Sequence, residues 1–94
     1  NSKGNDNTAL GYRALGGNTT GSKNTALGAE AGAKQSDGLT DLTGAENSIY
    51  IGHNVRGKDD DDDNSIVVGN DAIGIGANSV VLGNDAVTTT ALKG

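Results

Sequence analysis

One nine-residue unit occurs three times and constrains the fold of this chain more than any other feature. Its copies are Asn47–Val55, Asn64–Ala72 and Asn78–Ala86, which start 17 (64 − 47) and 14 (78 − 64) residues apart. Each copy reads Asn-Ser, three apolar residues, Gly, and a short turn. Two shortened copies, Asn7–Gly11 and Asn24–Gly28, precede them. Self-similarity at a short period is the signature of a solenoid, so the architecture is read from the repeat as a unit.

The residue types within the repeat favour strands. Its apolar runs are short, are β-branched in the second half of the chain, and are closed by Gly with Asn or Asp, as expected for strands of about four or five residues. A helix is disfavoured because each interior Gly costs about 1 kcal/mol relative to Ala. Gly and Asn tolerate positive φ and supply the corners. We therefore expect an all-β, short-repeat parallel β-solenoid.

Alignment of the five copies on their glycine predicts which residues pack and which turn. The positions one and three residues before the glycine carry most of the large aliphatic side chains, and we expect them to form the core of the repeat. The expected core residues are Leu10, Leu27, Ile49, Ile51, Ile66, Val68, Val80 and Leu82. The expected turn residues are Gly11, Gly28, Gly52, Gly69, Gly83, Asn70 and Asn84.

We expect residues 1–94 to form a single repeat domain. Within it, residues 1–46 hold irregular repeats with long spacers, residues 47–87 hold regular repeats, and residues 88–94 form a connector. The two shortened copies have one residue fewer before the glycine than the three later ones. This difference predicts a different strand register in the first half.

The composition indicates self-association. The chain has 94 residues, of which 33% are hydrophobic, with no Phe, Trp or Met and only two Tyr. Burial of Ile, Val, Leu and Ala alone in a chain of this size barely offsets the entropy lost on ordering it. Regularly spaced β-branched runs argue against disorder. We therefore expect further copies of the chain to complete the core.

Charge and composition exclude several classes of partner. The net charge is −5 and the pI is about 4.4, so no basic patch is available to bind nucleic acid. Cysteine is absent, which excludes disulfides and zinc–thiolate sites. No apolar run approaches the roughly 18 residues of a membrane-spanning helix, so we expect no membrane insertion. Asn1 is not a native start, and we expect the sequence to be a piece of a longer chain.

Four segments carry a family resemblance. Asn64–Gly74 and Asn78–Val87 resemble the head repeats of trimeric autotransporter adhesins, and are still more similar to the repeats of bacteriophage tail-fibre and tail-spike proteins. Asn7–Leu15 (Asn-Thr-Ala-Leu-Gly-Tyr-Arg-Ala-Leu) is similar to the Asn-Thr-Ala-Ile-Gly-Tyr repeats of the same fibres. Leu82–Gly94 resembles the segment that precedes an endosialidase-type intramolecular chaperone. The resemblance covers most of the chain.

This resemblance implies a homotrimer in which each chain winds a left-handed parallel β-roll or contributes to a triangular β-prism. It also implies a non-enzymatic, structural and receptor-binding role in a virion tail fibre, with a host-surface glycan or protein as the receptor. Two alternatives are a trimeric adhesin head on a bacterial cell surface and a fragment of a polysaccharide-degrading tail spike.

Five consecutive aspartates, Asp59 to Asp63, form the most distinctive local feature of the sequence. Asp59, Asp61 and Asp63 have the one-three-five spacing of an EF-hand loop, whose oxygen ligands suit Ca²⁺. Position six, however, is Asn64 instead of Gly, and position twelve is Asn70 instead of Glu. The pattern therefore fails as an EF-hand. A solvated acidic loop, extended by charge repulsion, is the favoured interpretation.

Three further motifs are interpreted as structural. His53 has no second His, Cys or Glu in a ligand-like spacing and occupies the turn position of Asn70, so we expect a turn residue. Gly74–Ser79 begins like a dinucleotide-binding fingerprint but has Ser in place of the third Gly and no βαβ unit around it. Asn18-Thr19-Thr20 has the form of a glycosylation sequon.

The sequence contains no recognisable catalytic set. His53 is the only candidate base and no nucleophile elbow is present, and no cofactor is expected. A glycosidase needs two carboxylates across a cleft, and nothing in the longest spacer pairs any two of its carboxylates. Those carboxylates are Glu30, Asp37, Asp41 and Glu46. The candidate ligand contacts are Tyr12, Arg13 and Arg56, while Tyr50 occupies a strand position suited to packing against a neighbouring chain.

Overall fold

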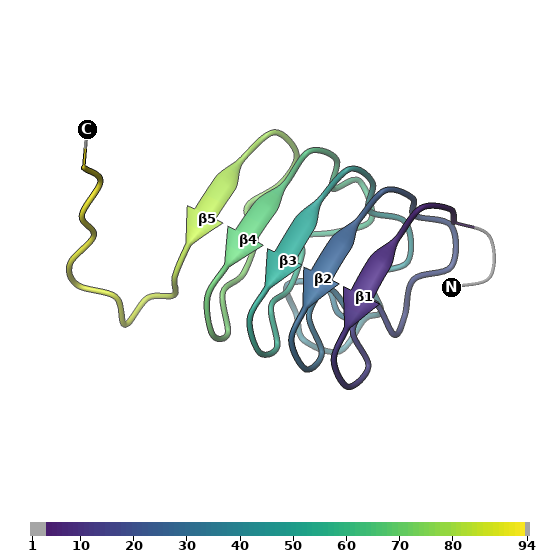
Figure 1. Ribbon diagram of the computed structural model, residues 1–94, viewed down its shortest axis with the longest axis horizontal. Helices are drawn as coiled ribbons and strands as arrows, with labels where there is room; N and C mark the ends of the chain where they lie inside the picture. The colour runs from purple at the N-terminus through teal and green to yellow at the C-terminus, as the bar shows by residue number, and fades with distance from the viewer. Residues whose placement is uncertain (1–3, 94) are drawn as a thin grey trace.

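The computed structural model describes residues 4–93, which contain no helix and wind into a solenoid with five short strands. The strands pair in parallel and in sequence order, β1-β2-β3-β4-β5, so that consecutive coils stack side by side (Figure 1). The strands are β1 (Thr8–Leu10), β2 (Thr25–Leu27), β3 (Ile49–Ile51), β4 (Ile66–Val68) and β5 (Val80–Leu82). The expected all-β parallel solenoid is confirmed.

The strand register is the same throughout, which corrects the expectation for the shortened copies. Thr8 pairs with Thr25, Thr25 with Ile49, and so on to Val80. Asn7 and Asn24 therefore occupy the position of Ser48, one residue after the repeat's first Asn. That first position has positive φ in all five coils and is held by Asp6, Lys23, Asn47, Asn64 and Asn78. The early copies therefore have full length, with Asp6 or Lys23 in place of the first Asn.

The five corner glycines lie where neighbouring coils come closest. Gly11, Gly28, Gly52, Gly69 and Gly83 all have positive φ. A Cβ on Gly28 would lie 2.5 Å from the carbonyl oxygen of Gly52, and one on Gly52 would lie 2.7 Å from that of Gly69. The stacked backbones leave no room for a side chain, so the glycine column sets how closely the coils can pack.

The middle residues of β2, β3 and β4 point into the interior of the solenoid. Tyr50 and Val67 have no exposed surface and Ala26 has 1%, and they pack with Leu42 and Val55. Because alternate residues of a strand face opposite sides, the residues on either side of the middle one point outward. The prediction that these flanking residues form the core of the chain is therefore wrong for Leu10, Leu27, Ile49, Ile51, Ile66, Val68, Val80 and Leu82, which are exposed or half-buried.

Polar side chains inside the coils satisfy the backbone just before each strand. The Nδ2 of Asn24 donates to the carbonyl of Ala45 (2.6 Å), while its Oδ1 accepts from the amide of Ser48 (3.0 Å). The Oγ of Ser48 in turn accepts from the amide of Ser65 (3.1 Å). This ladder runs from coil to coil and compensates for burial of these polar groups.

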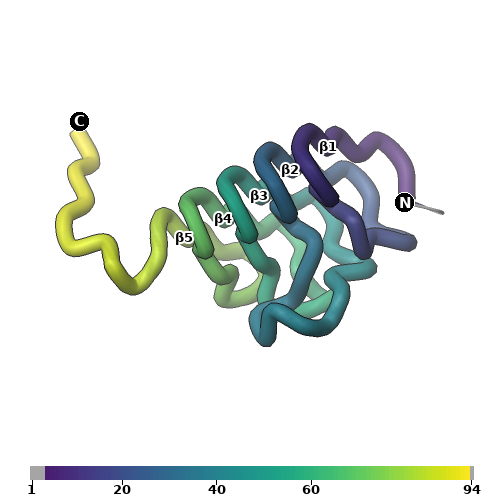
Figure 2. The backbone as a smooth tube through the Cα atoms, turned by 90° about the horizontal axis from the view of Figure 1, so that it is seen from below, coloured from purple at the N-terminus to yellow at the C-terminus, as the bar shows by residue number. Residues whose placement is uncertain are grey.

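Spacers of different length are absorbed away from the strands. The register partners Thr25 and Ile49 are 24 residues apart (49 − 25), whereas Ile66 and Val80 are 14 apart (80 − 66). The longest spacer contains an antiparallel bridge between Lys34 and Asp41. Residues 34–41 form this hairpin, which extends away from the strands (Figure 2). Insertions therefore change the outline of the coil but leave the sheet unaltered.

Candidate interaction surfaces

The outer face of the β1–β5 sheet carries two continuous columns of side chains. The column before the glycines consists of Leu10, Leu27, Ile51, Val68 and Leu82, and the second of Thr8, Thr25, Ile49, Ile66 and Val80. Leu10 is 67% exposed and Leu82 is 52% exposed. Parallel sheets usually have both faces covered, and contiguous exposed apolar patches mark interaction sites. This outer face is the largest candidate surface of the chain.

The corner after β1 presents an aromatic and a cationic side chain together. Tyr12 is 71% exposed, and the guanidinium carbon of Arg13 lies 5.9 Å from the centre of its ring. Arg56 is half-buried, and its Nη1 donates to the carbonyl of Ser36 (3.2 Å) beneath the hairpin. The three candidate ligand contacts are therefore not one site: Tyr12 and Arg13 form an exposed pair, while Arg56 supports the hairpin.

The Asp59–Asp63 run is a folded turn, which corrects the prediction of an extended acidic loop. Asp59 accepts from the amide of Asp61 (3.0 Å), and Asp60 accepts from the amide and hydroxyl of Thr43 (2.8 Å each). Asp63 accepts from Asn47 (2.9 Å). Asp59 therefore bonds within the turn, whereas Asp63 bonds to another corner of the coil. Among residues 4–93, no group of three or more acidic, His or Cys side chains is placed to hold a metal ion.

Asp62 points into the solenoid, unlike the other aspartates of the run. It is 1% exposed, and its Oδ2 accepts from the hydroxyl of Tyr50 (3.0 Å) and the amide of Lys58 (3.2 Å), whereas its Oδ1 has no partner. Burial raises the pKa of Asp62. Burial, followed by the nearby Asp62 carboxylate, raises the pKa of Tyr50 well above its usual value. The hydrogen bond between Tyr50 and Asp62 holds the acidic turn against the core.

Two carboxylates of the longest spacer, Asp37 and Asp41, are occupied by local contacts. Asp37 accepts from the hydroxyl of Thr40 (2.7 Å) and from the amides of Leu39 and Thr40 (2.9 Å each). These hydrogen bonds, led by the Thr40 hydroxyl, lower the pKa of Asp37 to about 2. Asp41 forms an ion pair with Lys34 at the base of the hairpin. Both carboxylates thus shape the hairpin, whose tip presents Leu39 at 82% exposure.

Two smaller motifs have structural positions. The Nδ1 of His53 lies 3.3 Å from the Oδ1 of Asn70 in the next coil, so His53 belongs to the stacked corner. Asn18 is 3% exposed and donates to the carbonyl of Gly21 (2.9 Å), which leaves its side chain inaccessible as a glycosylation acceptor. No helix among the described residues is long and apolar enough to cross a membrane.

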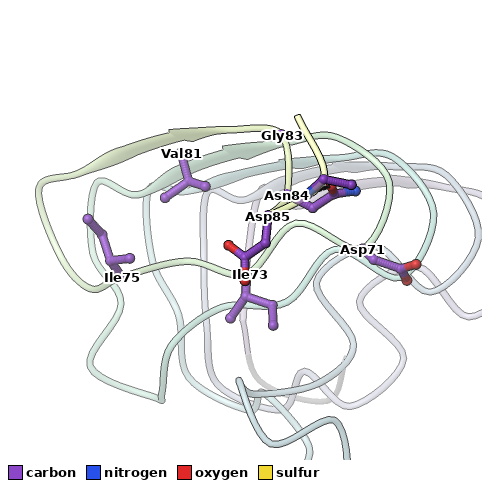
Figure 3. Close-up of a pocket in the computed structure, with 8 residues that line it drawn as sticks. Asp71, Ile73, Ile75, Val81, Gly83, Asn84 and Asp85 are labelled. Carbon is purple, nitrogen blue, oxygen red and sulfur yellow. Dashed lines mark hydrogen bonds between the residues drawn. The ribbon is translucent and has the colours of Figure 1, made fainter. Parts of the chain in front are cut away.

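A pocket of about 460 Å³ lies at the C-terminal end of the solenoid. Val81 points into it from β5, above the segment that carries Ile73 and Ile75, and Asp71 and Asp85 lie at its rim (Figure 3). It is lined by residues that precede and follow β5 as well as by Val81.

Comparison of this chain with protein-family models, with curated proteins and with solved structures finds no match.

Proposed function

We propose that this chain is a structural and attachment segment of a trimeric bacteriophage tail fibre, in which three copies bury the outer face of the β1–β5 sheet against one another. One observation carries the proposal: a parallel sheet with large aliphatic side chains on both faces has only its inner face covered by its own chain. Burying apolar surface contributes about 25 cal/mol per Å², so ten outward positions per chain provide a substantial driving force.

Each coil closes within one chain, because consecutive strands pair with each other in sequence order. This favours three left-handed β-rolls packed side by side over a prism whose sheets are shared between chains. In that arrangement the outer columns face the three-fold axis. The hairpin and the Tyr12–Arg13 pair remain on other surfaces and are available to a glycan or protein on the host surface.

Solution mass by light scattering tests the trimer. We expect the wild-type chain to be a trimer and Val68→Asp to be a monomer, since the substitution places a charge in the middle of the outer face. Leu39→Asp is the matched control: it puts the same charge on another exposed aliphatic residue, at the hairpin tip, and should leave the mass unchanged. A folded wild-type monomer would overturn the proposal.

Incubation of the chain with bacterial capsule or lipopolysaccharide distinguishes attachment from polysaccharide cleavage. We expect binding without release of reducing ends, and turnover would contradict the non-enzymatic role. An adhesin head would share the same trimer, and the flanking sequence distinguishes it: a C-terminal membrane anchor indicates an adhesin and a chaperone domain indicates a tail fibre.

A further inference from the structure

The solenoid stops at β5 although the chain continues. In the preceding coil, the segment after β4 returns across the opposite side and Ile73 forms a parallel bridge with Arg56. After β5 there is no such return: residues 88–93 are exposed, form no hydrogen bond and extend from the body (Figure 1). Coil five therefore has a strand and a corner but no second side.

The sequence after β5 has the register needed for that second side. The last two strands are offset by 14 residues (80 − 66), which places Val87 at the position of Ile73 and Thr89 at that of Ile75. Val87, Thr88 and Thr89 are all β-branched, and such residues suit extended pairing. The hydrogen-bond pattern can also continue: the amide of Arg56 donates to the carbonyl of Ala72 (2.9 Å), and in the same register the amide of Ile73 would donate to the carbonyl of Ala86.

The pocket at the end of the solenoid has the shape of the missing segment. Val67 has no exposed surface because Gly74 passes beneath it, so closely that a Cβ there would lie 3.2 Å from its Cγ2. Val81, the equivalent residue in coil five, remains half-buried above the pocket and has no such segment beneath it (Figure 3). The apolar lining from Ile73, Ile75 and Val81 is therefore complementary to a β-branched strand.

We propose that Val87–Thr89 is a strap that folds into this pocket and completes coil five. This closed form interconverts with the form in which the tail is extended. Two residues keep the closed form marginal. Thr88 stands where the preceding coils have Gly57 and Gly74, and its side chain must fit beneath Val81. Thr90 stands at the position of Gly76, whose φ of 124° is unfavourable for a β-branched residue. When the strap is in the pocket, residues 90–93 leave the solenoid from a different side than when the tail is extended.

Disulfide trapping in the full chain tests the strap, because the chain has no native cysteine. The pair Ile75→Cys with Thr89→Cys places two thiols on neighbouring coils, facing the same side in the closed form. The matched control is Ile75→Cys with Thr88→Cys, whose second thiol faces the opposite side. We expect severalfold faster intramolecular disulfide formation for the first pair. Equal rates would indicate a merely flexible tail, and a disulfide between chains would indicate exchange of tails; either result overturns the proposal.

Hydrogen exchange at the Ile73 amide gives a second reading that does not depend on cysteine chemistry. Thr88→Gly restores the glycine of the preceding coils and should slow exchange at Ile73 severalfold, since local opening governs the rate. Thr89→Gly is the control, because it makes the tail equally flexible but removes the side chain that covers Ile75, and it should not slow exchange. The same rate in both variants would contradict the strap. Neither readout depends on whether the chain forms a trimer.

Discussion

Each strand has an inner and an outer face, and the two differ in what covers them. Inside, Tyr50 and Val67 are fully enclosed by their own chain. Outside, Leu10 and Leu82 are largely exposed although they are as apolar as the residues within. Polarity therefore does not distinguish the two faces of this sheet. What differs is the cover: the coil encloses the middle residues of β2, β3 and β4, whereas no part of the same chain lies over the outer columns.

A charge should separate the two faces most sharply. Val67→Asp buries an unpaired carboxylate inside the coil and should cost roughly 4 kcal/mol or more in the free energy of unfolding. Val68→Asp, the same change one residue later, should leave the fold of a single chain intact. Thermal unfolding followed by circular dichroism measures both. If Val68→Asp also unfolds the chain, the assignment of the two faces is wrong.

The glycine column tests whether the inner packing depends on close stacking of the coils. Gly52→Ala introduces a Cβ 2.7 Å from the Gly69 carbonyl oxygen at a φ of 129°, and should cost about 1–3 kcal/mol. Gly44→Ala is the control, since its Cβ would come no closer than 3.4 Å to its nearest neighbour and its φ is not positive. Comparable losses of stability in urea unfolding would argue against a special role for the column.

The two tyrosines provide a comparison of an inner and an outer hydroxyl. Tyr50→Phe removes a hydrogen bond to the buried Asp62 carboxylate and should cost about 1–2 kcal/mol. Tyr12→Phe alters an exposed ring and should change stability by less than about 0.5 kcal/mol. Chemical denaturation of both variants checks this ordering, and equal effects would remove Tyr50 from the set of stabilising contacts.

The pH dependence of stability should reflect Asp62. Its pKa is raised in the folded chain, so the stability linked to its protonation is fully present below pH 3.8 and is lost as the pH rises through the folded pKa. Asp62→Asn cannot ionise and should lack this decline. Melting temperatures from pH 3 upward for the two proteins provide the test, and parallel curves would contradict it.

Asp37 should show the opposite and smallest effect, because its carboxylate is exposed on the hairpin. Its pKa is lowered to about 2, so its contribution is present above pH 3.8 and is lost as the pH falls toward 2. Asp37→Asn should remove this small contribution, so that stability at neutral pH falls slightly and little further stability is lost on acidification. A large effect at neutral pH would mean that the hairpin supports the core.

The repeat alone was sufficient to predict the parallel solenoid, since spacing and turn residues depend only on the order of residues. The inward face could not be predicted because both faces are apolar, and the direction in which the chain coils around the strands is a property of the whole coil. The early copies were misaligned because Asn stands at two adjacent positions of the repeat, although the three-residue strand before each glycine would have shown the true register. The Tyr50–Asp62 contact joins a strand to a spacer, and no local pattern in the aspartate run singles out its fourth member.

The absorption of spacers outside the sheet has a consequence for how such a chain can change its dimensions. Each coil adds one strand spacing of about 4.8 Å to the rod, whether its spacer has few residues or many. The length of the rod therefore depends on the number of strands, whereas the loops on its surface depend on the number of residues in the spacers. Duplication of a coil lengthens the rod, whereas insertion into a spacer alters only the loops on its surface, so the length and the surface of the rod can vary independently.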